Sequence, residues 1–286
     1  MICIYHSADN DGFASGAIMK RKYTNAVMIG YNYGEQLILP KDYNGEPIIM
    51  ADVSMKMPEM KKLAEVSKNQ FTWIDHHRSK IQEYYDFVGD GELFCTSVLE
   101  DGISACEGTW KYLFPDEPMP RGILLLGEYD TWRNGDKDRW ENQIIPFQFG
   151  MRSICNSVET FPSYLFGDND EIIDLIIEKG KAIIKYQSMV HQHIFRRAFE
   201  YEFEGLRAIC MNIGGVNSEA FKSVYDESKH DIMIPFFFTG KHWKFSIFTT
   251  KEIDCSLIAK KRGGGGHAKA CGFEVNDISE VFTHMK

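Results

Sequence analysis

Residues 71–80 read FTWIDHHRSK, an apolar and β-prone run followed at once by a carboxylate and two imidazoles. Aromatic and β-branched side chains such as those of residues 71–74 favour a strand. Continuous apolar strands are typical of parallel sheets, which are buried on both faces. Ligands of such sheets bind beyond the carboxyl ends of the strands. The run therefore predicts a buried strand that delivers Asp75, His76 and His77 to the sheet edge where a functional site is expected.

The first half of the chain repeats this pattern of short apolar runs separated by helical stretches. We expect strands at 2–5, 26–33, 46–52 and 71–75, and helices at 14–23 and 58–66. Pro58 suits the first turn of the second helix, because proline needs no backbone donor there. This alternation predicts an α/β domain in which helices cover both faces of a parallel sheet.

The second half begins with one long helical pattern at 168–200, in which apolar residues recur at helical spacing. Asp168 and Glu171 resemble a capping box at its start, and Gly180 is a weak point inside it. Apolar runs at 208–213, 232–238 and 243–250, with helical stretches at 217–227 and 255–262, predict a second, smaller α/β unit. We expect a first domain over 1–167, a linker helix over 168–200 and a second domain over 201–286.

Composition narrows the class of protein. No run approaches the roughly 18 apolar residues of a membrane span, and the N-terminus does not resemble a signal peptide. The 7 cysteines are scattered, without a CxxC pair, which indicates reduced thiols in a cytoplasmic protein. A net charge of −9 argues against binding of long duplex nucleic acid, which many Lys and Arg contacts hold. Short anionic substrates remain compatible where positive charge is local or metal ions supply it.

Further acidic and imidazole side chains follow other predicted strands: His6, Asp9 and Asp11 after the first, Asp52 after the third, and Asp130 further on in GEYDTW. Alone, a residue such as His6 or Asp52 is more often a structural cap. Together these carboxylates would repel one another unless cations intervene. Mixed carboxylate and imidazole ligands suit Mn²⁺, with Mg²⁺ or Fe²⁺ as alternatives, and a structural zinc site is not indicated. Two divalent ions roughly 3.5–4 Å apart would activate water and hold a phosphate.

The same residues belong to motifs that occur in a recognisable order. These are HSADNDGFASG at 6–16, ADVSM at 51–55, DHH at 75–77, EYDTW at 128–132 and GGGGHAKACGF at 263–273. Over nearly the whole chain, the pattern resembles the DHH phosphoesterases, specifically the two-domain DHH–DHHA1 branch. That branch includes oligoribonucleases (nano-RNases), pAp phosphatases and cyclic-dinucleotide phosphodiesterases, with RecJ nucleases and family II pyrophosphatases as distant members. One departure is that many relatives have Asp-x-Thr-Gly where this chain has Asp130-Thr131-Trp132.

The resemblance implies a catalytic centre of two divalent ions, most often Mn²⁺, in the first domain. It implies six metal ligands: His6, Asp9, Asp11, Asp52, His76 and Asp130. In this arrangement Asp52 bridges the two metals. Asp75 would orient the ligands from outside the centre. His77 would face the scissile phosphate, and Arg78 is a further candidate for contact with the substrate.

The glycine-rich segment KKRGGGGHAKACGF at 260–273 raises a separate question. An isolated glycine run is commonly a flexible linker or the end of a helix. Here the glycines are flanked by Lys and Arg, and their N–H groups could form a nest for an anion. The resemblance implies that this segment of the second domain binds the far phosphate or terminal nucleotide of the substrate. The candidate residues are Gly264, Gly265, Gly266, His267 and Lys269.

We therefore expect a metal-dependent phosphodiesterase that acts on short oligoribonucleotides or small (cyclic) nucleotides. A first alternative is a pAp phosphatase or an exopolyphosphatase-like phosphohydrolase. A second alternative is a non-catalytic module that senses a nucleotide. No membrane partner is expected, and a homodimer is compatible with the sequence. Trp132 and Trp140 fit two interpretations, stacking on a base or packing in the core.

Overall fold

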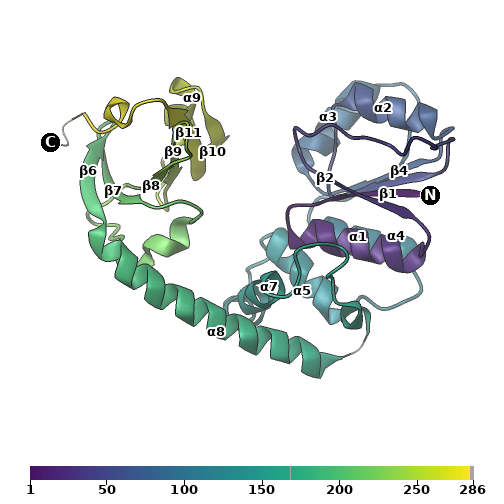
Figure 1. Ribbon diagram of the computed structural model, residues 1–286, viewed down its shortest axis with the longest axis horizontal. Coiled ribbons are helices and arrows are strands. Elements are labelled where there is room, and N and C mark those ends of the chain that lie inside the picture. The colour runs from purple at the N-terminus through teal and green to yellow at the C-terminus, as the bar shows by residue number, and fades with distance from the viewer. Residues whose placement is uncertain (168, 284–286) are drawn as a thin grey trace. The chain divides into compact units, whose positions relative to one another are not determined.

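The computed structural model describes residues 1–167 and 169–283 and divides into two compact units, Met1–Ile184 and Lys185–Lys286 (Figure 1). Asp168, the expected start of the capping box, lies outside the described residues. The division falls inside the long helix α8 (Asp170–Ile194). Each unit is built around its own sheet and its own apolar cores.

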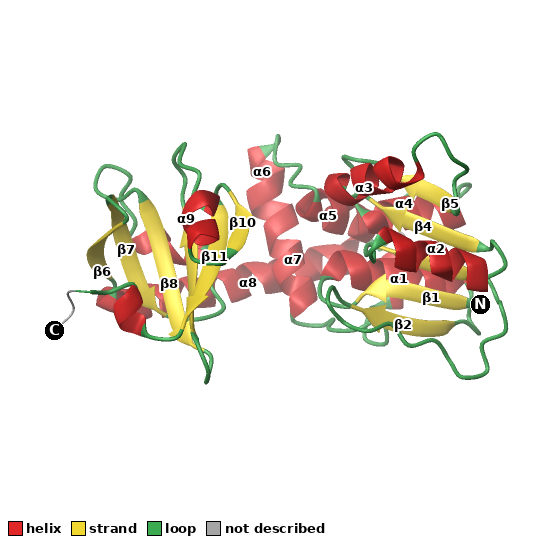
Figure 2. Ribbon diagram, turned by 90° about the horizontal axis from the view of Figure 1, so that it is seen from above, coloured by secondary structure: helices red, strands yellow, loops and turns green. Residues whose placement is uncertain are grey.

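The first unit contains a parallel sheet with the strand order β2-β1-β3-β4-β5 (Figure 2). The strands are β1 (Ile2–His6), β2 (Val27–Tyr31), β3 (Ile48–Ala51), β4 (Phe71–Asp75) and β5 (Thr96–Leu99). The predicted α/β class with a parallel sheet is confirmed. Strand β5 was not predicted, because its half-exposed sequence TSVL lies at the sheet edge and lacks the continuous apolar pattern.

The register of the sheet brings the predicted site residues to one edge. Ala51 of β3 pairs with Tyr5 of β1 and Ile74 of β4, so the chain leaves each of these strands at the same level. Parallel pairing means that the carboxyl ends of β1, β3 and β4 point the same way. The residues that follow these strands therefore gather at one place.

Helices cover both faces of this sheet. One apolar core forms beneath α1 (Asn10–Lys22), α4 (Ala105–Leu113), α5 (Arg121–Asp130) and α7 (Ile145–Arg152). The other forms beneath α2 (Met57–Val66), on the opposite side of the sheet with α3 (Arg78–Val88) (Figure 1). Shorter elements are α6 (Lys137–Arg139), the π-helical turn η1 (Trp140–Ile144) and the 3₁₀ turn η2 (Ser163–Phe166). This two-sided cover explains why β4 is apolar along its length.

Helix α8 packs against α7 through glycine. A Cβ atom at Gly180 would overlap the carbonyl oxygen of Pro146, and one at Gly150 would overlap the carbonyl oxygen of Ile176. Gly180 is therefore a close backbone contact rather than the weak point that its helix propensity indicated. The helix also ends before the expected residue 200, because η3 (Phe195–Arg197) and strand β6 (Phe199–Phe203) follow it.

The second unit contains a mixed sheet with the strand order β10-β11-β9-β8-β7-β6. The remaining strands are β7 (Leu206–Asn212), β8 (Ile232–Phe238), β9 (Trp243–Phe248), β10 (Gly265–His267) and β11 (Ala270–Val275). The helical elements are η4 (Ser218–Ser223), α9 (Ser256–Lys261) and η5 (Ile278–Glu280). One expectation needs correction, because the helix expected at 217–227 is a short 3₁₀ turn. The end of the glycine segment forms a hairpin with β11.

Within residues 1–167 and 169–283, no helix is both long and apolar enough to span a bilayer.

Candidate metal centre

His6 and Asp9 come together where β1 passes into α1. The Asp9 side chain caps α1 by accepting a hydrogen bond from the Gly12 backbone N–H at 3.0 Å. Its other oxygen lies 3.3 Å from Nδ1 of His6. Gly12 is required by this turn, because a Cβ atom there would overlap the His6 backbone carbonyl. The cap also explains why α1 begins at Asn10, earlier than expected.

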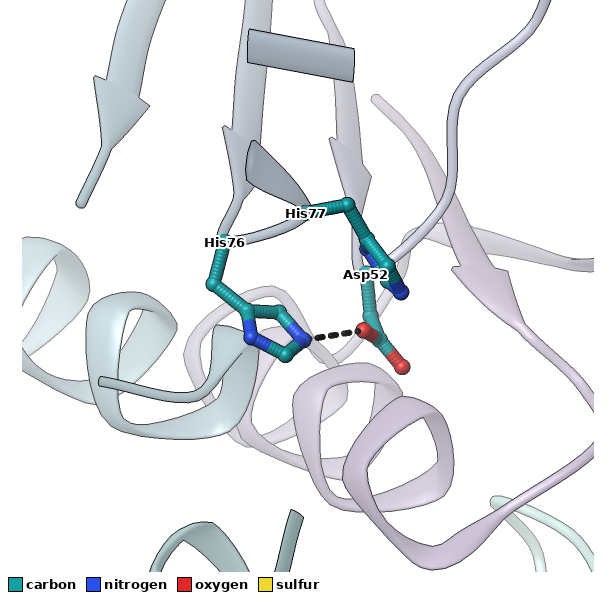
Figure 3. A group of neighbouring side chains, drawn as sticks. All are labelled: Asp52, His76 and His77. Atoms are coloured by element: carbon teal, nitrogen blue, oxygen red, sulfur yellow. Dashed lines mark ion pairs between the residues drawn. The ribbon is translucent and has the colours of Figure 1, made fainter. Parts of the chain in front are cut away.

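Asp52 lies between the histidines of β1 and β4, and its side chain is only 3% exposed. One carboxylate oxygen is 3.5 Å from Nδ1 of His6, and the other is 3.4 Å from Nε2 of His76. Figure 3 shows the side chain beside His76 and His77 at the strand ends. Its backbone has φ +63°, a left-handed conformation that Asp tolerates better than most residues. The two oxygens of Asp52 therefore face the two histidines on opposite sides of the cluster.

Asp11 is fixed by the start of α4, a helix far away in the sequence. Its two carboxylate oxygens accept hydrogen bonds from the backbone N–H groups of Ala105 at 2.9 Å and Cys106 at 2.8 Å. Burial and the nearby Asp52 carboxylate raise the pKa of Asp11. One of its oxygens lies 3.6 Å from Nε2 of His76. The helix N-terminus thus holds the carboxylate in place while it faces the histidine.

His76 also faces Asp130, the last residue of α5, whose carboxylate lies 3.2 Å from Nε2. Burial and the Asp11 carboxylate raise the pKa of Asp130 to about 7. Burial by itself would lower the pKa of His76, but the surrounding carboxylates raise it to about 9. The neighbouring carboxylates of Asp52 and Asp9 likewise raise the pKa of His6 to about 10. The cluster carries an excess of negative charge that a cation would compensate.

Asp75 holds its two neighbours by a single carboxylate oxygen. That oxygen accepts hydrogen bonds from the backbone N–H groups of His76 at 2.7 Å and His77 at 3.0 Å. It also lies 2.6 Å from Nδ1 of the His77 ring. The Asp75 carboxylate therefore orients the ring of His77, whereas it reaches His76 only through the backbone. Because Nδ1 contacts Asp75, Nε2 of the partly exposed ring remains available. The same carboxylate raises the pKa of His77 and so favours the protonated ring, in which Nε2–H is a donor.

The donor set fits divalent metal ions. Three groups of side chains, all among the described residues, place potential ligand atoms within 4.8 Å of one another: His6, Asp9 and Asp52; Asp11, His76 and Asp130; and Asp52, His76 and His77. Among these same residues, His6 Nδ1, Asp52 Oδ2 and His76 Nε2 are buried and have no hydrogen-bond partner. Such atoms are costly unless something binds them. The mixed carboxylate and imidazole donors are those that Mn²⁺ accepts readily.

Tyr33 is a neighbour of this centre that the sequence did not reveal. Its ring centroid lies 5.7 Å from that of His6 and 6.5 Å from that of His77. Burial of the hydroxyl and the nearby Asp75 raise the pKa of Tyr33 to about 12, so the phenol keeps its proton. The sequence predicted a strand over 26–33, which placed Tyr33 inside that strand. In the structure β2 ends at Tyr31, and Tyr33 belongs to the turn beyond it.

The two tryptophans beyond Asp130 have different environments. Trp140 is buried and stacks on Tyr129, with ring centroids 5.7 Å apart, so it packs in the core. Trp132 is 65% exposed and has φ +57°. Arg133 contacts the buried Glu107 at 2.7 Å, which is a structural ion pair.

The glycine segment of the second unit borders a hollow of about 600 Å³, which Lys244, Arg262 and residues 263–266 help to line. This hollow includes the predicted Gly264, Gly265 and Gly266. His267 and Lys269 are exposed, and Lys269 contacts Glu252 at 2.7 Å. In the first unit Arg78 is exposed at the start of α3.

Comparison with known proteins adds sequence relatives, although no protein-family model matches the chain. Protein R106 of Acanthamoeba polyphaga mimivirus, which is uncharacterised, is 25% identical over all of this chain and 70% of its own length. Oligoribonuclease NrnB of Bacillus subtilis is 24% identical over 99% of this chain and 75% of its own length. Both alignments thus include the two units and all the motifs of the candidate site.

Two solved structures share the fold. The pGpG-specific phosphodiesterase PggH of Vibrio cholerae has a TM-score of 0.52 at 15% identity, over 98% of this chain and 94% of its own. RecJ of Thermus thermophilus, solved with Mn²⁺, has a TM-score of 0.53 at 13% identity, over 99% of this chain and 50% of its own. The shared fold and the cluster of carboxylates and imidazoles at the strand ends agree with the expected resemblance to the two-domain DHH–DHHA1 phosphoesterases.

Proposed function

We propose that the protein is a metal-dependent phosphodiesterase that hydrolyses short oligoribonucleotides or small (cyclic) nucleotides. The observation that carries this proposal is Asp52, whose two oxygens face His6 on one side and His76 on the other. The activities named for NrnB, an oligoribonuclease, and PggH, a pGpG-specific phosphodiesterase, support the same class of substrate.

The proposed metals are two divalent ions, Mn²⁺ in preference to Mg²⁺. Six side chains would hold them: His6, Asp9, Asp11, Asp52, His76 and Asp130. When bound, such ions supply Lewis acidity toward water and toward the oxygens of a phosphate. The start of α4 keeps Asp11 oriented, and the cap of α1 keeps Asp9 beside His6. Asp75 fixes the ring of His77, so that its free Nε2 can face the scissile phosphate.

Substrate binding is assigned to both domains of the proposed division, 1–167 and 201–286, with 168–200 as the linker. In the second domain, Gly264, Gly265, Gly266, His267 and Lys269 would bind a phosphate of the substrate. The hollow beside the glycines, with Arg262 and Lys244 on its lining, supports this role. In the first domain, Arg78 would contact the substrate next to His77. His267→Ala is expected to lose most turnover of a dinucleotide while the protein keeps its metal, because the segment would also position the scissile bond.

A turnover panel with added Mn²⁺ tests the proposal. It compares RNA of two to five nucleotides, pAp, cyclic dinucleotides, cyclic mononucleotides and polyphosphate. We expect the highest kcat/KM for short RNA or a (cyclic) nucleotide diester. A highest value for pAp or polyphosphate would instead indicate a phosphomonoesterase or a phosphoanhydride hydrolase. Nucleotide binding without any turnover would indicate a sensing module.

A further inference from the structure

An exposed aromatic side chain borders the candidate metal centre without belonging to its ligands. Tyr33 is 48% exposed, yet its ring lies within 5.7 Å of the His6 ring and 6.5 Å of the His77 ring, measured between centroids. Its plane is inclined at 65° to the first imidazole and at 82° to the second. Neither imidazole therefore lies parallel to the phenol ring, and the exposed part of that ring lies beside residues proposed to bind metal and phosphate.

The ring is presented by a defined turn. Glu35 donates its backbone N–H to the Asn32 carbonyl at 3.1 Å, which closes a tight turn over residues 32–35. The Glu35 carboxylate in turn accepts a hydrogen bond from the Asn32 backbone N–H at 3.0 Å. Gly34 has φ +87°, a conformation that other residues adopt only with strain. Because the turn holds its backbone, Tyr33 loses little conformational entropy when it binds a partner.

The chemistry of an open aromatic face beside a phosphate site selects a class of ligand. A nucleobase has a π-face whatever its identity, and stacking on an aromatic side chain is tolerant of sequence. Inorganic phosphate, polyphosphate and sugar phosphates offer no such face. A ligand that combines a phosphate with a base would use the imidazole and carboxylate cluster and Tyr33 together.

We propose that Tyr33 is a specificity-determining residue, whose ring stacks on the base of the nucleotide that has its phosphate at the metal centre. This inference rests on the proposed function and deepens it, because it makes the base, rather than the phosphate alone, part of what the first domain recognises.

The test compares a ligand that has both a phosphate and a base with a ligand that has the phosphate and the sugar but no base. Equilibrium binding of AMP and of ribose 5-phosphate to the Mn²⁺-loaded protein is measured for wild type, Tyr33→Ala, Tyr33→Phe and Tyr164→Ala. Tyr164 is a control of similar exposure, 43%, in the same unit. We expect Tyr33→Ala to weaken the binding of AMP about tenfold, in line with the loss of stacking on one base, and to leave the affinity for ribose 5-phosphate unchanged. Tyr33→Phe keeps the ring and should bind AMP as wild type does, as should Tyr164→Ala.

Kinetics provide a second readout. On the dinucleotide ApA, Tyr33→Ala should raise KM about tenfold and change kcat by less than about twofold, with the metal content intact. If Tyr33→Ala weakened the binding of AMP and of ribose 5-phosphate equally, the inference would be overturned, because Tyr33 would then act on the phosphate or on His77. Loss in Tyr33→Phe would assign the effect to the hydroxyl, and unchanged AMP binding in Tyr33→Ala would remove any role in base recognition. If the wild type hydrolyses no diester, the proposed function fails, while the binding comparison still decides the role of Tyr33.

Discussion

At the scale of single residues, Asp52 combines an unusual backbone with a central position. A side chain at φ +63° is strained for most residues, but Asn tolerates this conformation as well as Asp does. Asp52→Asn therefore removes the charge and leaves the turn unaltered. The variant therefore tests the charge of Asp52 apart from its backbone conformation. The charge matters because the carboxylate faces both His6 and His76.

We expect Asp52→Asn to lower the bound Mn²⁺ and to reduce turnover by more than about 100-fold, beyond the typical cost of losing a partner that only supports a ligand. Asp75→Asn is the matched variant, because the Asp75 carboxylate contacts the ring of His77, which is not one of the six proposed metal ligands. It should keep the metal and lose about 10–100-fold in turnover. Measuring the metal content and the turnover rate of both purified variants distinguishes loss of a metal ligand from loss of a residue that orients His77. Full activity in Asp52→Asn would contradict the metal centre.

The residues of the candidate site were predictable to different degrees. His6, Asp52 and His76 follow apolar strands, and the parallel pattern was enough to expect them at one edge. The two N–H groups that hold Asp11 come from residues 105 and 106, and no local pattern links them to α1. Ser104 and Glu107 form a capping box that marks the start of α4, but a cap does not identify the side chain that it will meet. Tyr33 was missed for a similar reason, since its role depends on a tertiary neighbour.

At the scale of elements, the patterns with strong periodicity were correct and the weak ones were not. Strand β4 was predicted at its observed bounds, because an uninterrupted apolar run is buried on both faces. The helix expected at 217–227 is a 3₁₀ turn, since amphipathic spacing over a short segment does not determine the helix type. Helix propensity does not explain Gly180. The residue stabilises the fold by allowing the backbone of α8 to pack closely on that of α7.

Gly180→Ala tests that packing. Helix propensity alone predicts a gain of up to about 1 kcal/mol for this change in the interior of a helix. We expect the opposite sign, a loss of about 1–3 kcal/mol, because the new methyl group would overlap the Pro146 backbone. Urea unfolding of the whole chain measures the free energy, and Ser188→Ala, at an exposed position of α8, is the control. Stabilisation in Gly180→Ala would show that α8 is not held this closely.

Asp231 joins elements of the second sheet and gives a prediction about pH. Its carboxylate accepts hydrogen bonds from the Arg207 guanidinium at 2.9 and 3.0 Å and from Lys251 at 2.7 Å. These contacts hold the pKa of Asp231 well below its usual range. A carboxyl group with a depressed folded pKa stabilises the fold above its unfolded pKa of about 3.9, and this stability is lost as the pH falls toward the folded value.

We expect Asp231→Asn to destabilise the strands β7 and β8 by about 1.5–3 kcal/mol at pH 7, the range for hydrogen bonds to charged groups. The difference from wild type should persist at pH 5 and narrow below about pH 4, where Asp231 of the unfolded chain takes up a proton while the folded carboxylate stays charged. This difference in stability is measured by hydrogen exchange of the β7 and β8 amides in the whole chain, after correction for intrinsic exchange rates. Glu219→Gln, at an exposed position, is the control. A difference that stays constant down to pH 2 would contradict the electrostatic origin.

At the scale of the whole molecule, charge limits the length of a bound nucleic acid. A long strand gains affinity from each additional phosphate that a basic side chain neutralises. This chain has 41 acidic and 32 basic residues, so added phosphates meet a net repulsive field outside any local basic group. Some of its cations are already committed to carboxylates, as Arg207 and Lys251 are to Asp231.

We therefore expect kcat/KM to be highest for RNA of two to five nucleotides and to fall for longer strands. The salt dependence provides the physical check. If about two phosphates are bound, log kcat/KM should fall against log salt with a slope of about −1.4, and the slope should stay the same from a 5′-phosphorylated dinucleotide to a 20-mer. A basic track along the protein would instead steepen the slope as the strand lengthens. Rates for a length series at several salt concentrations distinguish these outcomes, and equal or better digestion of the 20-mer would contradict a preference set by charge.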